Sequence, residues 1–176
     1  FVDAWSLLIL LQPPLAGLFM YLFLRSLKLT PLAAVFGSVP FMFCGFMTVW
    51  MPYGTLSMAV AFLPLALYAV QRYQDSLQSR YLLLLALSVM ISFFSGHVQM
   101  SIYSALFICA YIGLVFWQTK KKTVFVSLLG GFLLGIIISL VQLLPTLLLY
   151  QQSVRSELFF NAEGIPWYYP VTLFAP

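Results

Sequence analysis

The chain has 176 residues, of which 63% are hydrophobic and 7% are charged, and its formal net charge at pH 7 is +4. An ordinary soluble domain carries roughly 25% charged residues. This composition and a mean hydropathy of +1.04 therefore exclude a soluble globular protein. The small positive charge does not indicate a nucleic-acid partner, and its placement along the chain matters more than its size. The sequence predicts an all-α, polytopic bundle of transmembrane helices.

Six segments are apolar and close to the length of about 20 residues that a helix needs to cross the hydrocarbon core. They run near 4–24, 31–50, 54–71, 81–96, 98–118 and 123–145. Prolines at positions 13, 14, 40 and 64 lie inside them. Neighbouring helices can satisfy the backbone groups that proline leaves unpaired, so we expect kinks rather than helix ends. Residues 1–150 are expected to form the bundle, and 151–176 the start of an extracytoplasmic segment.

Basic residues lie in every second connection between these segments. Seven of the eight follow this pattern: Arg25, Lys28, Arg72, Arg80, Lys120, Lys121 and Lys122. Only Arg155 lies on the opposite side. Cytoplasmic loops of membrane proteins carry the excess of Lys and Arg, so the connections expected to be cytoplasmic are 25–30, 72–80 and 119–122. The turn near 96–98 and the tail 146–176 are expected to face outward.

The last apolar segment carries small residues at every fourth position: Ser127, Gly131, Gly135 and Ser139. Such a ribbon lets a second helix approach closely within the membrane, so we interpret it as an assembly surface. Gln142 follows Gly135 by seven residues and returns to nearly the same face. The glutamine is therefore predicted to face protein or a cavity rather than lipid.

The stretch "SGHVQMSIY" (95–103) interrupts the apolar pattern and holds the single histidine, His97, followed by Gln99. Serines at 88, 92 and 95 share one helical face before it, and His97 shares a face with serines 101 and 104 after it. Both polar stripes run up to Gly96, which predicts a close antiparallel hairpin with the hydroxyls and the imidazole in its seam. Arg80 precedes His97 by 17 residues, about 26 Å of helix, so the turn is expected at or just below the outer interface.

Four polar residues fall on the predicted outer side: His97, Gln99, Gln142 and Arg155. For His97 the structural alternative is a helix-end histidine that bonds a backbone carbonyl, and for Gln142 it is an interhelical hydrogen bond. Arg155 can contact a lipid headgroup or pair with Glu157, or its forked guanidinium can bind an anionic ligand such as a phosphate. A site built from these residues would open outward at the membrane surface.

Recognisable enzyme and metal motifs are missing from the sequence. It has no phosphate-binding glycine loop and no catalytic-triad order. Cys44 and Cys109 lie deep in apolar runs, far from His97 and without metal-ligand spacing, so we interpret them as small buried hydrophobes. The sequence specifies no cofactor and no metal.

Four stretches carry a resemblance to a known family: "LAGLFMYLFLRSLKLTPLAAVFGSVPFMFCGF" (15–46), "FLPLALYAVQRY" (62–73), "SGHVQMSIY" (95–103) and "VQLLPTLLLYQQSVRSE" (141–157). In this order they resemble the bacterial YfhO-like family of polytopic membrane proteins, and the resemblance spans essentially the whole chain. That family is similar to the large GT-C-type glycosyltransferases, which use polyprenyl-phosphate-linked sugars on the outer membrane face. The family's turn is commonly Gly-His-Pro-Gln, and here Val98 stands in place of the proline.

The resemblance implies transfer of a sugar from a polyprenyl-phosphate-linked donor to a cell-envelope acceptor, such as a teichoic-acid-type polymer, at the bacterial cell membrane. The GT-C pattern places its key acid in the first outer loop. We expect the sequence to be a piece of a longer protein that starts after that loop, and Asp3 does not match the motif position. The catalytic base is therefore left unassigned. The four outer residues are expected to bind substrate or the lipid phosphate, with Arg155 and His97 nearest the departing phosphate.

Two other functions remain open. A lipid or solute transporter would need charges within the membrane or helices broken at mid-depth, and the six segments contain no charged residue at such a depth. A structural subunit would pack through the Ser/Gly ribbon, and its outer polar residues would scatter rather than converge.

Overall fold

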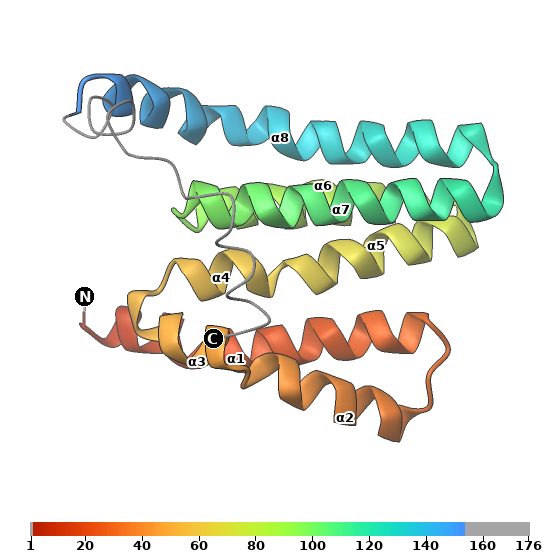
Figure 1. Cartoon of the computed structure of the whole chain (residues 1–176), viewed down its shortest axis with the longest axis horizontal. Helices are drawn as coiled ribbons and strands as arrows, with labels where there is room; N and C mark the ends of the chain where they lie inside the picture. The colour runs from red at the N-terminus through yellow and green to blue at the C-terminus, as the bar shows by residue number, and fades with distance from the viewer. Residues whose placement is uncertain (1, 154–176) are drawn as a thin grey trace, which may run out of the picture. The chain divides into compact units, whose positions relative to one another are not determined.

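The computed structural model describes residues 2–153, and these form helices joined by short connections (Figure 1). The elements are α1 (Val2–Ser26), α2 (Pro31–Met42), α3 (Gly45–Trp50), the 3₁₀ turn η1 (Met51–Tyr53), α4 (Leu56–Ala61), α5 (Leu63–Ser76), α6 (Ser79–Phe94), α7 (Val98–Thr119) and α8 (Lys122–Gln151). Residues 1–142 make up one compact unit, which holds the bundle. The described part of the second unit, 143–153, carries the last turns of α8, with Pro145 inside the helix. The all-α membrane bundle predicted from the sequence is confirmed.

All six predicted segments are helical, but they differ in their capacity to cross a membrane. Four helical stretches are long and apolar enough: Val2–Ser26, Leu56–Ser76, Val98–Thr119 and Lys122–Gln151. A fifth arises if α2 and the Gly45–Tyr53 stretch, which are bent by 44°, count as one span. The sixth segment is α6, whose 16 residues extend about 24 Å and so fall short of a hydrocarbon core of about 30 Å.

The prolines affect the helices in different ways. Pro13 and Pro14 lie within the uninterrupted α1. Pro40 lies two residues before the end of α2, where the chain bends before α3. Pro64 is in the first turn of α5, just after a one-residue interruption at Phe62. Each segment continues beyond its proline, as neighbouring helices allow in a membrane bundle.

The connections gather at two opposite ends of the bundle (Figure 1). We call one the basic end, formed by the connections at 27–30, 77–78 and 120–121, and the other the turn end, formed by 51–55 and 95–97. The predicted alternation of basic and non-basic connections is therefore reproduced by the antiparallel helices. At the basic end the chain turns through residues with positive φ, namely Lys28, Leu77 and Lys120. This left-handed conformation commonly ends a helix, usually with glycine.

Close approach of small residues holds the helices together. A Cβ atom added to Gly135 of α8 would lie 2.7 Å from the Ala86 carbonyl oxygen of α6, and one added to Gly131 would lie 3.1 Å from that of Leu82. Gly131, Gly135 and Ser139 are buried. The predicted small-residue ribbon is thus an assembly surface, and its partner is α6. Large apolar side chains instead cover the outside, including Leu10, Trp117 and Val141 at 71%, 72% and 77% exposed, as expected where the surroundings are lipid.

Candidate functional site

The hairpin between α6 and α7 turns at Gly96, whose φ of +87° is accessible to glycine without strain. Ser101 Oγ donates a hydrogen bond to the Ser92 carbonyl across the hairpin at 2.7 Å. Ser92 Oγ in turn donates to the Ala59 carbonyl of α4 at 2.8 Å. Four serines of the seam are buried: Ser88, Ser92, Ser101 and Ser104. The predicted hairpin with hydroxyls in its seam is confirmed.

His97 lies at the start of α7, next to the serine seam, because Ser101 Oγ also donates to its carbonyl at 3.2 Å. It is half-buried and acts as the N-cap of α7, because its Nδ1 accepts a hydrogen bond from the Met100 backbone N–H at 3.3 Å. The sequence-based alternative had this histidine bonding a carbonyl, and the structure shows it accepting from an N–H instead. Nδ1 must then be unprotonated, so the neutral ring carries its proton on Nε2. Within residues 2–153, Nε2 has no hydrogen-bond partner, which leaves one donor for a ligand.

The other three expected site residues have different positions. Gln99 is exposed in the first turn of α7, and its Nε2 donates to the Tyr103 hydroxyl at 2.8 Å. Gln142 is half-buried on α8, three residues after buried Ser139. It lies about 30 Å along α8 from Lys122, a rise comparable with the length of α7, which places it toward the turn end. Arg155 lies outside the described residues. His97 and Gln99 both lie at the N-terminus of α7, as their sequence positions require, and their side chains have different hydrogen-bond partners.

A cavity of about 290 Å³ lies beside this turn. Three parts of the chain line it: Trp5 and Leu8 of α1, Gly54, Thr55 and Met58 around the start of α4, and Ile91, Phe94 and Ser95 at the end of α6. The lining is mainly apolar, with the hydroxyls of Thr55 and Ser95 as its polar groups. Ser95 lines the cavity two residues before His97, and His97 itself is not among the lining residues.

Two glycines shape this cavity. Gly54 has a φ of +72°, and a Cβ atom there would lie 2.6 Å from Cη2 of Trp5, so only glycine lets the indole pack against this backbone. A Cβ atom on Gly96 would lie 3.6 Å from Thr55 Cγ2, which places the two turns in contact. Sequence reasoning assigned no site role to Trp5, Gly54 or Thr55. Gly54 and Thr55 belong to the stretch Pro-Tyr-Gly-Thr (52–55). This composition predicts a turn and could have drawn attention to both residues.

Gln12 is a second feature that sequence reasoning missed. It is fully buried in α1, and its Nε2 donates to the Met51 carbonyl at 3.5 Å. Its Oε1 is buried without a partner among the described residues. An amide in the middle of an apolar membrane segment is costly unless neighbouring protein satisfies it, and that cost was the available signal.

The polar groups at the turn end can form hydrogen bonds with a ligand. This end presents an imidazole N–H, hydroxyls and a side-chain amide, and the cavity lining contains no carboxylate. Asp3 is exposed in the first turn of α1 and does not line the cavity. Within residues 2–153, no group of three or more His, Cys, Asp or Glu side chains could hold a metal ion.

A family model described as "Bacterial membrane protein YfhO" matches residues 1–174. Neither the curated proteins nor the solved structures contain a match. The family model covers nearly the whole chain, including the six helical segments and the Gly-His turn. The chain therefore belongs to the YfhO family of bacterial membrane proteins.

Proposed function

We propose that this chain is part of a GT-C-type membrane glycosyltransferase. It transfers a sugar from a polyprenyl-phosphate-linked donor to a cell-envelope acceptor on the outer face of the cell membrane. Membership of the YfhO family supports the proposal, because that family resembles the GT-C enzymes in its multi-helix membrane architecture. In this proposal residues 1–150 form the membrane bundle and 151–176 begin an extracytoplasmic segment. The basic end is cytoplasmic and the turn end is extracytoplasmic.

The observation that carries the proposal is the apolar cavity beside the His97 turn, at the end opposite the basic connections. A polyprenyl-phosphate donor needs an apolar groove for its isoprenoid chain and hydrogen-bond donors for its phosphate. The cavity volume of about 290 Å³ is near the lower limit of about 300 Å³ for pockets that enclose drug-sized ligands. It therefore suits the first isoprene units of a donor whose remaining chain lies in the bilayer.

In this mechanism His97 binds and orients the phosphate. The negative charge on the departing lipid phosphate grows as the glycosidic bond breaks, so a fixed N–H donor beside it lowers the barrier. The capping bond through Nδ1 fixes the ring and leaves Nε2 as that donor. Gln99, Gln142 and Arg155 are proposed as further ligands of the donor. The general base for the acceptor hydroxyl is assigned to no described residue.

The test compares two substitutions of His97 in the full-length protein, assayed in membranes with a panel of radiolabelled polyprenyl-phosphate hexoses. Asparagine is a good N-cap and alanine is not, so His97→Asn keeps the helix cap and removes the imidazole, whereas His97→Ala removes both. We expect both variants to lose about 10²- to 10³-fold in transfer rate, as when one donor to a developing oxyanion is removed. Full transfer by the Asn variant and loss only in the Ala variant would reduce His97 to a helix cap.

The cavity has its own matched pair of variants. Leu8→Trp fills the cavity, whereas Leu7→Trp adds the same indole to a neighbouring side chain that is 57% exposed and does not line it. We expect the Leu8 variant to raise the KM for the lipid donor and the Leu7 variant to leave it unchanged. Equal effects of the two substitutions on this KM would show that the cavity is not the binding site of the lipid donor.

A transporter is the alternative function, and one observation favours it. The α2–α3 segment is broken and bent by 44°, and broken helices are a feature of transporter binding sites. The discriminating measurement is flux of lipid-linked sugar across proteoliposomes that contain the full-length protein but no acceptor. Flux without acceptor favours transport, and transfer without flux favours the glycosyltransferase.

A further inference from the structure

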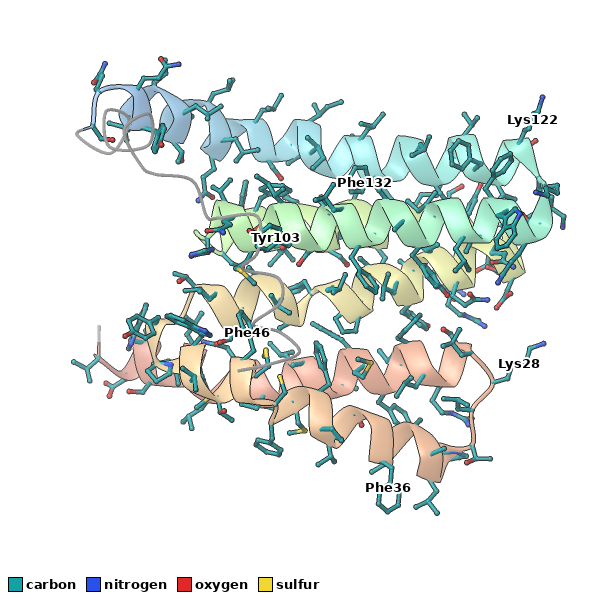
Figure 2. The ribbon with its side chains drawn as sticks, viewed as in Figure 1. Lys28, Phe36, Phe46, Tyr103, Lys122 and Phe132 are labelled. Carbon is teal, nitrogen blue, oxygen red and sulfur yellow. The ribbon has the colours of Figure 1, made fainter. Side chains whose placement is uncertain are left out.

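Two neighbouring cavities lie at the basic end, far from the turn-end site. The smaller, of about 190 Å³, lies between α1 and α5 and is lined by Leu22, Arg25, Ser26, Tyr68 and Arg72. The larger, of about 320 Å³, is lined by Ser26, Leu27, Lys28, Gln71, Tyr111, Leu114 and Gln118. Ser26 lines both cavities, so they meet at the end of α1. Figure 2 shows Lys28 at this end of the bundle, together with Lys122 at the start of α8.

Two arginines from different helices line the smaller cavity, and each is fixed through only part of its guanidinium. Arg25 Nη1 donates to the Leu29 carbonyl at 2.7 Å. Arg72 Nε donates to the Tyr81 hydroxyl at 3.4 Å, and its guanidinium carbon lies 5.5 Å from the centre of the Tyr81 ring. The remaining N–H groups of both side chains make no hydrogen bond within residues 2–153. They are the donors that recognise phosphate oxygens in a forked geometry.

Within residues 2–153, the positive charge around this cavity is only partly offset, by the electrostatic attraction between Asp75 and Arg72. No carboxylate of residues 2–153 forms a salt bridge with Arg25 or Arg72. Asp75 is the nearby acid on α5, and its Oδ1 accepts from Gln71 Nε2 at 3.5 Å. Arg80 adds a further cation, since its Nη2 donates to the Tyr81 hydroxyl at 3.2 Å. An anion in the cavity would be favoured by several cations at once.

Aromatic side chains place this end at the level of lipid headgroups. Trp117 is 72% exposed, and Lys120 Nζ lies 6.0 Å from the centre of its ring. Exposed tryptophan beside lysine is typical of a membrane interface. Leu22 supplies an apolar wall of the cavity. It lies three residues before Arg25, toward the middle of α1, which is the direction in which the acyl chain of a bound lipid would extend.

We propose that the smaller cavity binds the phosphodiester headgroup of an anionic phospholipid of the cytoplasmic leaflet, with Arg25 and Arg72 as its cationic ligands and Lys28 beside it. Basic pockets between transmembrane helices at this side of a membrane bind anionic headgroups. The volume is below that of pockets for drug-sized ligands, so it suits one headgroup rather than a sugar nucleotide. The proposal rests on the basic end being cytoplasmic, and it is independent of the glycosyl-transfer reaction.

The test uses the purified full-length protein in detergent, titrated with short-chain phosphatidylglycerol and, separately, phosphatidylcholine, with bound lipid counted by native mass spectrometry. The test variant is Arg25→Gln/Arg72→Gln. Its control, Lys121→Gln/Lys122→Gln, removes the same two charges at the same end but lines neither cavity. Each cation near an anionic lipid contributes about fivefold in affinity. We expect the arginine pair to weaken phosphatidylglycerol binding by about 25-fold and the lysine pair to change it by less than twofold.

Two further measurements identify the ligand and distinguish lost binding from misfolding. The single variants Arg25→Gln and Arg72→Gln should each lose about fivefold, which separates binding from a collapse of the double variant. Glycerol phosphate at millimolar concentration should fail to displace the lipid. Equal losses in the two double variants, or unchanged binding in the arginine pair, would overturn the site. Displacement by glycerol phosphate at a matching affinity would overturn its assignment to a lipid.

Discussion

Substituting Gly135 with alanine tests the packing of α8 on α6. The new Cβ atom would lie 2.7 Å from the Ala86 carbonyl oxygen and 2.8 Å from Val89 Cβ. Ordinary contacts of this kind begin near 3.4 Å, so the helices must separate locally by about 3.4 − 2.7 = 0.7 Å. The contacted atoms are a backbone carbonyl and a Cβ, which cannot rotate away. Overpacking of this kind costs about 1–3 kcal/mol.

Gly130 supplies the matched control on the same helix. A Cβ atom there meets nothing within 4 Å, so Gly130→Ala gains only the better helix propensity of alanine, up to about 1 kcal/mol. Because Gly135→Ala gains the same helix propensity, this term cancels, and we expect the two variants to differ by the overpacking cost of about 1–3 kcal/mol in the free energy of unfolding, measured by titration with sodium dodecyl sulfate in mixed micelles. A Gly135→Ala variant as stable as Gly130→Ala would refute the close α6–α8 contact.

Three further outcomes follow from the described geometry. Leu77→Gly should stabilise the protein by about 1 kcal/mol, because glycine relieves the positive φ of 56°, whereas Leu77→Ala should not; equal stabilities in the same titration would contradict this. Ser101→Ala should cost about 0.6 kcal/mol, the average for a hydrogen bond between membrane helices, and a neutral result would show that the Ser92 carbonyl finds another donor. In a cysteine-free background, Gln99→Cys should react with an impermeant maleimide in intact cells and Lys121→Cys only after permeabilisation; the reverse pattern would invert the topology.

The sequence predicted the local elements and several of their contacts correctly. Lipid offers no hydrogen bonds, so an apolar segment of sufficient length must form a helix whatever its neighbours. Hydropathy therefore located all six helical segments. The helical spacing of the serines around Ser101 identified the hairpin seam, and the small residues at every fourth position around Gly135 identified the ribbon on α8. His97 was placed correctly at the turn. Its bonding partner was not, because helix periodicity does not decide whether a ring nitrogen meets a carbonyl or an N–H.

The tertiary structure alone decided the features that join distant segments. Gln12 meets the Met51 carbonyl 39 residues away, and the turn-end cavity combines Trp5 with Gly54 and Ser95. Arg25 and Arg72 likewise line one cavity from different helices. In the sequence analysis these arginines served only to predict orientation, because the order of charges along a chain does not show which of them lie close together in the folded protein. Which side chains face one another depends on how closely two helices approach, and small residues such as Gly135 set that approach only once the partner helix is in place.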